Sequence, residues 1–91
     1  MSPPAYEVMW TPSAQRDLRR LPEKVATAVA EFVYGSLVAN PQRVGRALHL
    51  DLAGLHAARR GEYRVIYRID EDAHVVRIAA VDHRADAYRP R

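Results

Sequence analysis

The fold is decided by residues 59–70, which read RRGEYRVIYRID. Side chains alternate between the two faces of a β-strand. The face with aromatic and β-branched side chains consists of Tyr63, Val65, Tyr67 and Ile69. The opposite face consists of Arg64, Ile66 and Arg68. Because a strand with one apolar face is typical of a half-buried sheet, the sequence predicts a central strand with a core face and an arginine face.

Arginine supplies nearly all the positive charge of the chain. Of the 14 basic residues only Lys24 is a lysine, and the net charge is +3. The guanidinium group binds phosphate or carboxylate in two places, whereas lysine offers a point charge. Codon usage in a GC-rich genome is an alternative source of the bias, but it does not explain arginines gathered on one strand face.

The length of 91 residues predicts a single domain, residues 1–91, with one modest core. The sequence has no cysteine, which excludes disulfides and thiolate zinc sites. We see no signal peptide and no apolar run near the roughly 20 residues that span a bilayer. The sequence therefore predicts a cytoplasmic location and no membrane contact.

The remaining elements follow from spacing and from start and stop signals. Thr11 and Pro12 are typical of a helix start, Asn40-Pro41 of a helix end, and Asp70–Ala73 of a turn. The predicted strands are 5–10, 55–60, 63–69 and 74–81, the helices 12–21 and 23–38, with a helical turn at 85–88. A turn this short joins antiparallel strands. We expect an α+β fold, strand–helix–helix–strand–strand–strand, with an antiparallel sheet and a helical hairpin on one face.

An even-numbered loop at Asp70–Ala73 predicts which residues share the open face of the sheet. This register sets Arg64 opposite Ala79, Arg68 opposite Val75, Ile66 opposite Arg77, and Arg60 opposite His83. The open face would then hold Arg60, Arg64, Arg68, Arg77 and His83, with Arg84 and Tyr88 at its rim and no acidic residue between them. Asp82 and Glu62 are the only nearby acidic residues that could form ion pairs with these arginines. Such a face fits a phosphate diester, and the alternative is a solvated face whose arginines serve solubility.

Two segments resemble the RelE/ParE toxin superfamily of type II toxin–antitoxin modules, on its RelE side. They are residues 61–69, GEYRVIYRI, and residues 81–88, VDHRADAY. Residues 16–22 and 41–55 also resemble that family, so the likeness covers essentially the whole chain. The combination of a GxYRxxY strand with a following HRxxxY is specific, whereas either half alone is weak.

The resemblance implies an endoribonuclease that cuts mRNA in the ribosomal A site without a metal or other cofactor. The RNA 2′-hydroxyl attacks the adjacent phosphate and the 5′-oxygen leaves. By residue matching, Arg64 stabilises the phosphorane charge, Arg84 is the second catalytic arginine, and Tyr88 lies near the nucleophile. RelE-type members can carry two lysines on the strand before the glycine, and their role would pass here to Arg46, Arg59 or Arg60, or be absent. A cognate antitoxin and the ribosome are the implied partners.

Two questions stay open at this point. His83 is the side chain best matched to neutral pH as base or acid, but a strand-end histidine bonded to Asp82 is an equal alternative, and Tyr88 has packing as its alternative. The ParE branch shares the scaffold and inhibits DNA gyrase without catalysis, and fold alone does not separate the two. A plain RNA-binding module is disfavoured because the arginine face has no aromatic platform for bases.

Overall fold

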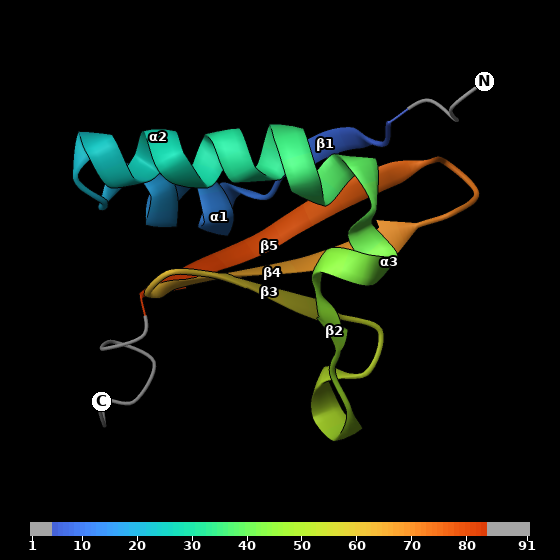
Figure 1. Cartoon of the computed structure of the whole chain (residues 1–91). Helices are drawn as coiled ribbons and strands as arrows, with labels where there is room; N and C mark the ends of the chain where they lie inside the picture. The colour runs from blue at the N-terminus through green and yellow to red at the C-terminus, as the bar shows by residue number, and fades with distance from the viewer. Residues whose placement is uncertain (1–4, 84–91) are drawn as a thin grey trace.

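The computed structural model describes residues 5–83 as two layers, with the helices on one face of a twisted sheet (Figure 1). The predicted turn at 85–88, Arg84 and Tyr88 lie outside the described residues. The elements are β1 (Glu7–Trp10), α1 (Pro12–Arg19), α2 (Glu23–Phe32) with a π-helical continuation (Val33–Leu37), α3 (Pro41–Val44), β2 (Arg46–Ala47), a 3₁₀ turn (Leu50–Leu52), β3 (His56–Arg60), β4 (Tyr63–Asp70) and β5 (Val75–His83). The predicted α+β class is confirmed.

The sheet has the strand order β1-β5-β4-β3-β2. The antiparallel meander of β3, β4 and β5 is as predicted, but β1 pairs parallel with β5 at one edge. The pairing of β1 was not predicted, and its parallel direction makes the sheet mostly antiparallel. The α1–α2 hairpin lies in the connection that carries the chain away from β1. Two further elements, β2 and α3, were not predicted, because a two-residue strand and a one-turn helix are too short to show a period.

The start of α1 follows the sequence signals. The Thr11 hydroxyl accepts a hydrogen bond from the Ala14 N–H at 3.1 Å, and Pro12 occupies the first helical position. Pro22 then begins α2, since its carbonyl accepts from the N–H groups of Val25 and Ala26. Pro41 ends the long helical segment, as predicted, but it also begins α3 because proline suits a first helical turn.

The core lies between α2 and the apolar face of the sheet. Its fully buried side chains include Val29, Val33 and Leu37 from the helical layer and Val65, Tyr67, Val76 and Ile78 from the strands. Burying a side chain of this size contributes about 1.5–3 kcal/mol. The Tyr67 hydroxyl donates to the Pro41 carbonyl at 2.6 Å, and a Cβ at Gly45 would collide with that hydroxyl. Burial raises the pKa of Tyr67 to about 12.

The β4–β5 register differs from the prediction in two places. His74 has a φ of +57°, so β5 begins at Val75 and pairs with Asp70, which shifts the four-residue loop one position along the chain. Further on, Tyr67 pairs with Ile78 but Ile66 pairs with Ala80, which leaves Ala79 as an extra residue in β5. An extra residue reverses the alternation of faces beyond it.

Within residues 5–83, no helix is both long enough and apolar enough to cross a membrane.

Candidate functional site

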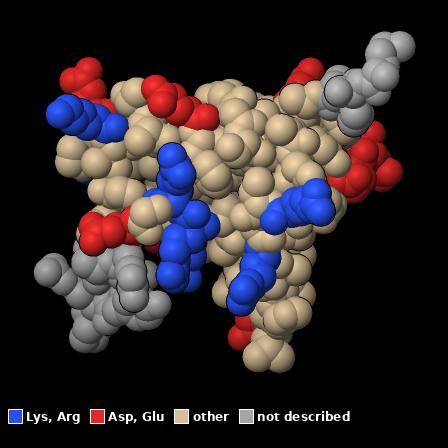
Figure 2. All heavy atoms as spheres, in the orientation of Figure 1, with Lys and Arg blue, Asp and Glu red and all other residues tan. Residues whose placement is uncertain are grey.

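The open face of the sheet carries a cationic groove at its β3 end. The groove has a volume of about 620 Å³ and is lined by Arg43, Val44, Gly45, Arg46, Leu48, Ala57, Arg59 and Arg64. Figure 2 shows Lys and Arg side chains gathered where the surface is hollowed beside the protruding segment that follows β2. Arg59 and Arg64 are cross-strand neighbours on β3 and β4, and both line the groove.

Two nitrogens of the Arg64 guanidinium differ in their contacts: one forms an ion pair and another has no hydrogen-bond partner among the described residues. Its Nη2 lies 3.4 Å from Oδ2 of Asp82, and the two side chains are 40% and 38% exposed. Its Nε is buried and has no hydrogen-bond partner among the described residues. A buried donor without an acceptor is costly, but the exposed part of the Arg64 side chain borders the groove, where an anionic oxygen can reach it. The arrangement therefore suits a phosphate more than a neutral ligand.

Asp82 corrects the prediction of a face without acidic residues. The extra residue Ala79 brings Asp82 opposite Arg64, where Ala79 itself was expected. A half-exposed ion pair of this kind contributes little to stability, at most about 1 kcal/mol. The pair holds the Arg64 guanidinium across β4 and β5.

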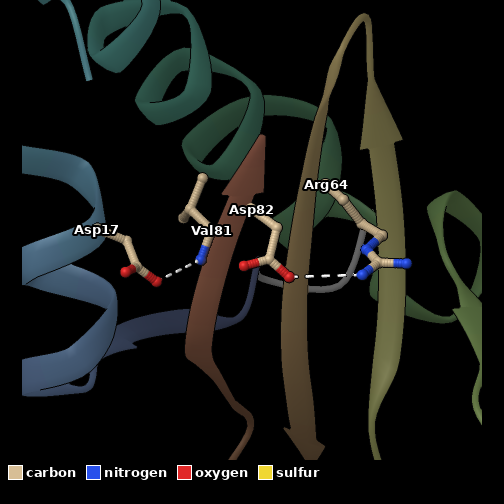
Figure 3. A network of polar contacts seen from close by, with 4 residues as sticks. All are labelled: Asp17, Arg64, Val81 and Asp82. Carbon is tan, nitrogen blue, oxygen red and sulfur yellow. Dashed lines mark hydrogen bonds and ion pairs between the residues drawn. The ribbon is translucent and has the colours of Figure 1, made fainter. Parts of the chain in front are cut away.

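Side chains from α1 hold β5 where it carries Asp82 (Figure 3). β1 ends opposite Ile78, so the edge of β5 beyond Ile78 is taken by α1 and its cap. The Thr11 hydroxyl donates to the Ala79 carbonyl at 3.1 Å, and the Asp17 carboxylate accepts from the Val81 N–H at 3.0 Å. These two bonds, which we call the α1 clamp, satisfy backbone groups on the edge of β5 that β1 leaves unpaired.

The structure brings together part of the predicted set. Arg46, Arg59 and Arg64 line one groove, while Arg68 and Arg77 lie opposite one another further along the same face. The predicted pairing of Arg60 with His83 is wrong. Arg60 pairs with Tyr63, and it lines a separate hollow on the helix side with Ala28, Glu31, Phe32 and Ser36.

His83 also lies on the helix side of the sheet, because the extra residue Ala79 reverses its face. It pairs with Tyr63 in the ladder, and the two rings meet edge to face with centroids 4.9 Å apart. Its Nε2 lies 3.5 Å from Oε2 of Glu62, so the carboxylate beside it belongs to Glu62, and the Asp82 carboxylate instead contacts Arg64.

Sequence reasoning missed Arg43 and Asp17. Arg43 lies in residues 41–54, for which the sequence indicated a linker with several possible local structures, and α3 carries it to the groove wall. Asp17 was seen only as part of a family-like segment, and its contact with Val81 spans 64 positions. In residues 5–83 no group of three or more His, Asp or Glu side chains is arranged to hold a metal ion.

Comparison with known proteins identifies the family. Residues 8–88 match the model of the ParE toxin of type II toxin–antitoxin systems, parDE. Toxin RelE of Mycobacterium tuberculosis is 54% identical over 84 residues, which cover 92% of this chain and 87% of that protein. Toxin RelG of the same organism is 51% identical over 84 residues, covering 92% and 97%.

A solved structure agrees in fold and in sequence. It is the toxin–antitoxin complex RelBE2 from Mycobacterium tuberculosis, which matches with a TM-score of 0.86 and 48% identity over 89% of this chain and 100% of the matched one. A likeness in both sequence and coordinates over nearly the whole length is that of one family. The chain belongs to the RelE/ParE superfamily of type II toxin–antitoxin toxins, in its RelE branch.

Proposed function

We propose that this toxin is an endoribonuclease that cleaves mRNA in the ribosomal A site, without a metal or other cofactor, and so inhibits translation. The observation that carries the proposal is Arg64, whose 40% exposed side chain borders a cationic groove together with three further arginines. The relatives named Toxin RelE and Toxin RelG support this branch. The cytoplasm, where translation takes place, is the corresponding location.

The reaction moves charge onto a phosphate, and the groove supplies fixed cations for it. The RNA 2′-hydroxyl attacks the adjacent phosphorus, a new O–P bond forms, and the bond to the 5′-oxygen breaks. Arg64 stabilises the added negative charge on the phosphorane, which is usually the largest catalytic contribution. Arg84 and Tyr88, which follow β5 in the sequence, are assigned the second cation and the group near the nucleophile.

The acid–base step belongs to the C-terminal segment rather than to His83. His83 lies on the helix side, against Tyr63 and Glu62, whereas Arg64 lies on the open face. Positioned acid or base groups contribute roughly 10²–10⁴-fold each, and they act only within hydrogen-bond reach of the reacting atoms. Tyr88 is the remaining titratable candidate, and its acidity would be raised by neighbouring arginines.

The substrate backbone is assigned to the groove arginines. Arg46 and Arg59 would take over the role of the strand lysines of RelE-type toxins, and Arg43 adds a further cation on the same wall. Arg60 opens onto the other side of β3, so it is not needed for this path. Arg68 and Arg77 lie further along the open face.

The cognate antitoxin is the second partner. The related RelBE2 structure is a toxin–antitoxin complex, which supports a similar assembly for this chain. An antitoxin segment with acidic side chains would neutralise the groove arginines and exclude the RNA phosphates. The antitoxin and the ribosome-bound mRNA would then compete for the same cations.

The test is Arg64→Ala, with Arg19→Ala as the matched control, since Arg19 is an exposed arginine on α1. Purified variants are added to ribosomes that hold a defined mRNA codon in the A site, and cleavage is followed by primer extension. Loss of a phosphorane-stabilising cation is expected to lower the cleavage rate by about 10²–10³-fold. Full activity of Arg64→Ala, with the control also active, would contradict the proposal.

The alternative is a ParE-like inhibitor of DNA gyrase that acts by binding. The matching family model is described as a ParE toxin, which is the observation that favours it. Expression of the toxin in cells separates the two functions. Codon-positioned mRNA cuts support the ribonuclease, and broken chromosomal DNA with intact mRNA supports gyrase inhibition.

A further inference from the structure

Two arginines face each other directly across the β4–β5 ladder. Arg68 on β4 is the register partner of Arg77 on β5, and both side chains are exposed on the open face. Neither forms an ion pair within residues 5–83. Like charges opposite one another destabilise a sheet, so the pair has no evident benefit for folding.

A strip of small and aliphatic side chains separates this pair from the groove. It consists of Ala57, Ile66 and Ala80, which are cross-strand neighbours on β3, β4 and β5. All three are partly exposed. Arg64 and Arg68 are four residues apart on β4, which corresponds to about 13 Å along the strand. The open face thus alternates cation, uncharged strip and cation.

Gly54 lies in the segment between β2 and β3, which we call the arm, and its backbone approaches Arg68. A Cβ at Gly54 would lie 2.6 Å from Nη1 and 3.5 Å from Cζ of Arg68. Gly54 also has a φ of +94°, a conformation that favours glycine. The backbone of the arm therefore approaches the guanidinium closely and limits its freedom, which reduces the entropy lost when it binds a ligand.

We propose that Arg68 and Arg77 form a second phosphate subsite, which holds a linkage of the same RNA strand outside the cleaved bond. This rests on the proposed ribonuclease function. At a rise of about 3.4 Å per nucleotide, 13 Å spans roughly four stacked nucleotides, and fewer in an extended strand. The strip of Ala57, Ile66 and Ala80 lies under the riboses and bases between the two phosphates. Arg68 and Arg77 contribute to binding, and Arg64 contributes to the reaction.

The test measures toxin binding to ribosomes whose mRNA carries 2′-O-methyl groups over the A-site codon, so that no cleavage occurs. Wild type, Arg68→Ala/Arg77→Ala, Arg64→Ala and the control Arg19→Ala are titrated at several salt concentrations. We expect the double variant to bind about tenfold more weakly, as for the loss of a charged hydrogen bond. Its slope of log affinity against log salt falls by about 0.7 for one lost phosphate contact.

A second measurement locates the phosphate. One linkage at a time is replaced by an uncharged methylphosphonate, within four linkages on each side of the cleaved bond. One replacement outside the cleaved bond is expected to weaken wild type but not the double variant. Arg68→Gln, which keeps an extended polar side chain, is expected to lose the same salt dependence and to melt at or above the wild-type Tm, since it removes a like-charge contact.

The outcomes separate the subsite from the function. If Arg64→Ala abolishes cleavage while the double variant binds like Arg19→Ala with the wild-type salt slope, the subsite is wrong and the ribonuclease stands. The subsite is also wrong if every methylphosphonate weakens the double variant as much as wild type. If Arg64→Ala retains full cleavage, the proposed function fails independently of the subsite.

Discussion

At the scale of single residues, Asp82 controls how readily the Arg64 guanidinium can bind a phosphate. Its carboxylate occupies Nη2 of Arg64 at 3.4 Å, while the buried Nε remains without a partner among the described residues. In the free toxin the carboxylate keeps the guanidinium across the strands. In the proposed complex it competes with the RNA phosphate for the same cation, because both are anionic acceptors.

Asp82→Asn removes this competition and adds one unit of positive charge to the groove. We expect the affinity for ribosomes with 2′-O-methyl mRNA to rise by about 0.2–1 kcal/mol, the range of an exposed ion pair. Glu23→Gln on α2 makes the same charge change away from the groove and serves as the control. Weaker binding of Asp82→Asn than of the control would indicate that Asp82 orients Arg64 more than it competes.

Elements far apart in sequence meet at the end of β5. Beyond the end of β1, the α1 clamp of Thr11 and Asp17 satisfies backbone groups on the edge of β5, one of them the carbonyl of the bulged Ala79. Figure 3 shows the sequence of contacts, from Asp17 to Val81 and from the next residue, Asp82, to Arg64. The position of Arg64 relative to the groove thus depends on α1, which does not touch the open face.

Asp17→Ala leaves the Val81 N–H without its acceptor. We expect the free energy of unfolding to fall by about 1–3 kcal/mol, measured by urea denaturation. Asp17→Asn retains an acceptor oxygen and is expected to lose less. The control is Arg16→Ala, which removes an exposed side chain from the same helix. Equal stability of Asp17→Ala and Arg16→Ala would mean that the clamp does not hold β5.

The same elements explain how far the sequence predicted the fold. The two faces of β4 followed from alternation, and the α1 start from Thr11 and Pro12, because these signals are local. The bulge at Ala79 left no local signal, since Ala79 and Ala80 fit either face of a strand. Its stabilising contacts come from α1, so it is a tertiary feature. The parallel pairing of β1 with β5 is non-local for the same reason.

The candidate site was also predicted correctly where the signal was local and wrongly where it depended on strand register. Arg46, Arg59 and Arg64 were chosen by charge and by likeness to a family, and the structure places them in one groove. His83 was placed on the wrong face because the predicted register lacked the extra residue, whereas Arg60 was misplaced because it belongs to β3 and pairs with Tyr63 across the β3–β4 turn. The roles of Arg84 and Tyr88 stay predictions, since both lie outside the described residues.

At the scale of the whole molecule, the two faces of the sheet differ. One face packs against the helices and forms the apolar core, and the open face carries the groove arginines. The helices cover the apolar side, where Tyr67 is fully buried and its hydroxyl bonds to the Pro41 carbonyl at the start of α3. Because α3 leads into β2 and the groove wall, this single buried hydroxyl links the core to the segment that carries Arg43 and Arg46. Unfolding of the core is therefore expected to disrupt the groove wall that carries Arg43 and Arg46 as well.

The buried hydroxyl of Tyr67 makes the stability of the fold depend on pH. Burial raises its pKa from 10.0 to about 12, so the folded protein keeps the proton where the unfolded chain loses it. The contribution of the protonated Tyr67 to the free energy of unfolding is complete below pH 10. It is lost as the pH rises from 10 to 12, by about 1.4 kcal/mol per pH unit. Tyr67→Phe cannot titrate there, and it is less stable at pH 7 by about 1 kcal/mol for the lost hydrogen bond. Urea denaturation from pH 7 to 12 should show the wild-type advantage shrinking above pH 10. Tyr34→Phe, at an exposed position, is the control, and a constant gap between wild type and Tyr67→Phe would show that the phenol is not shielded from water.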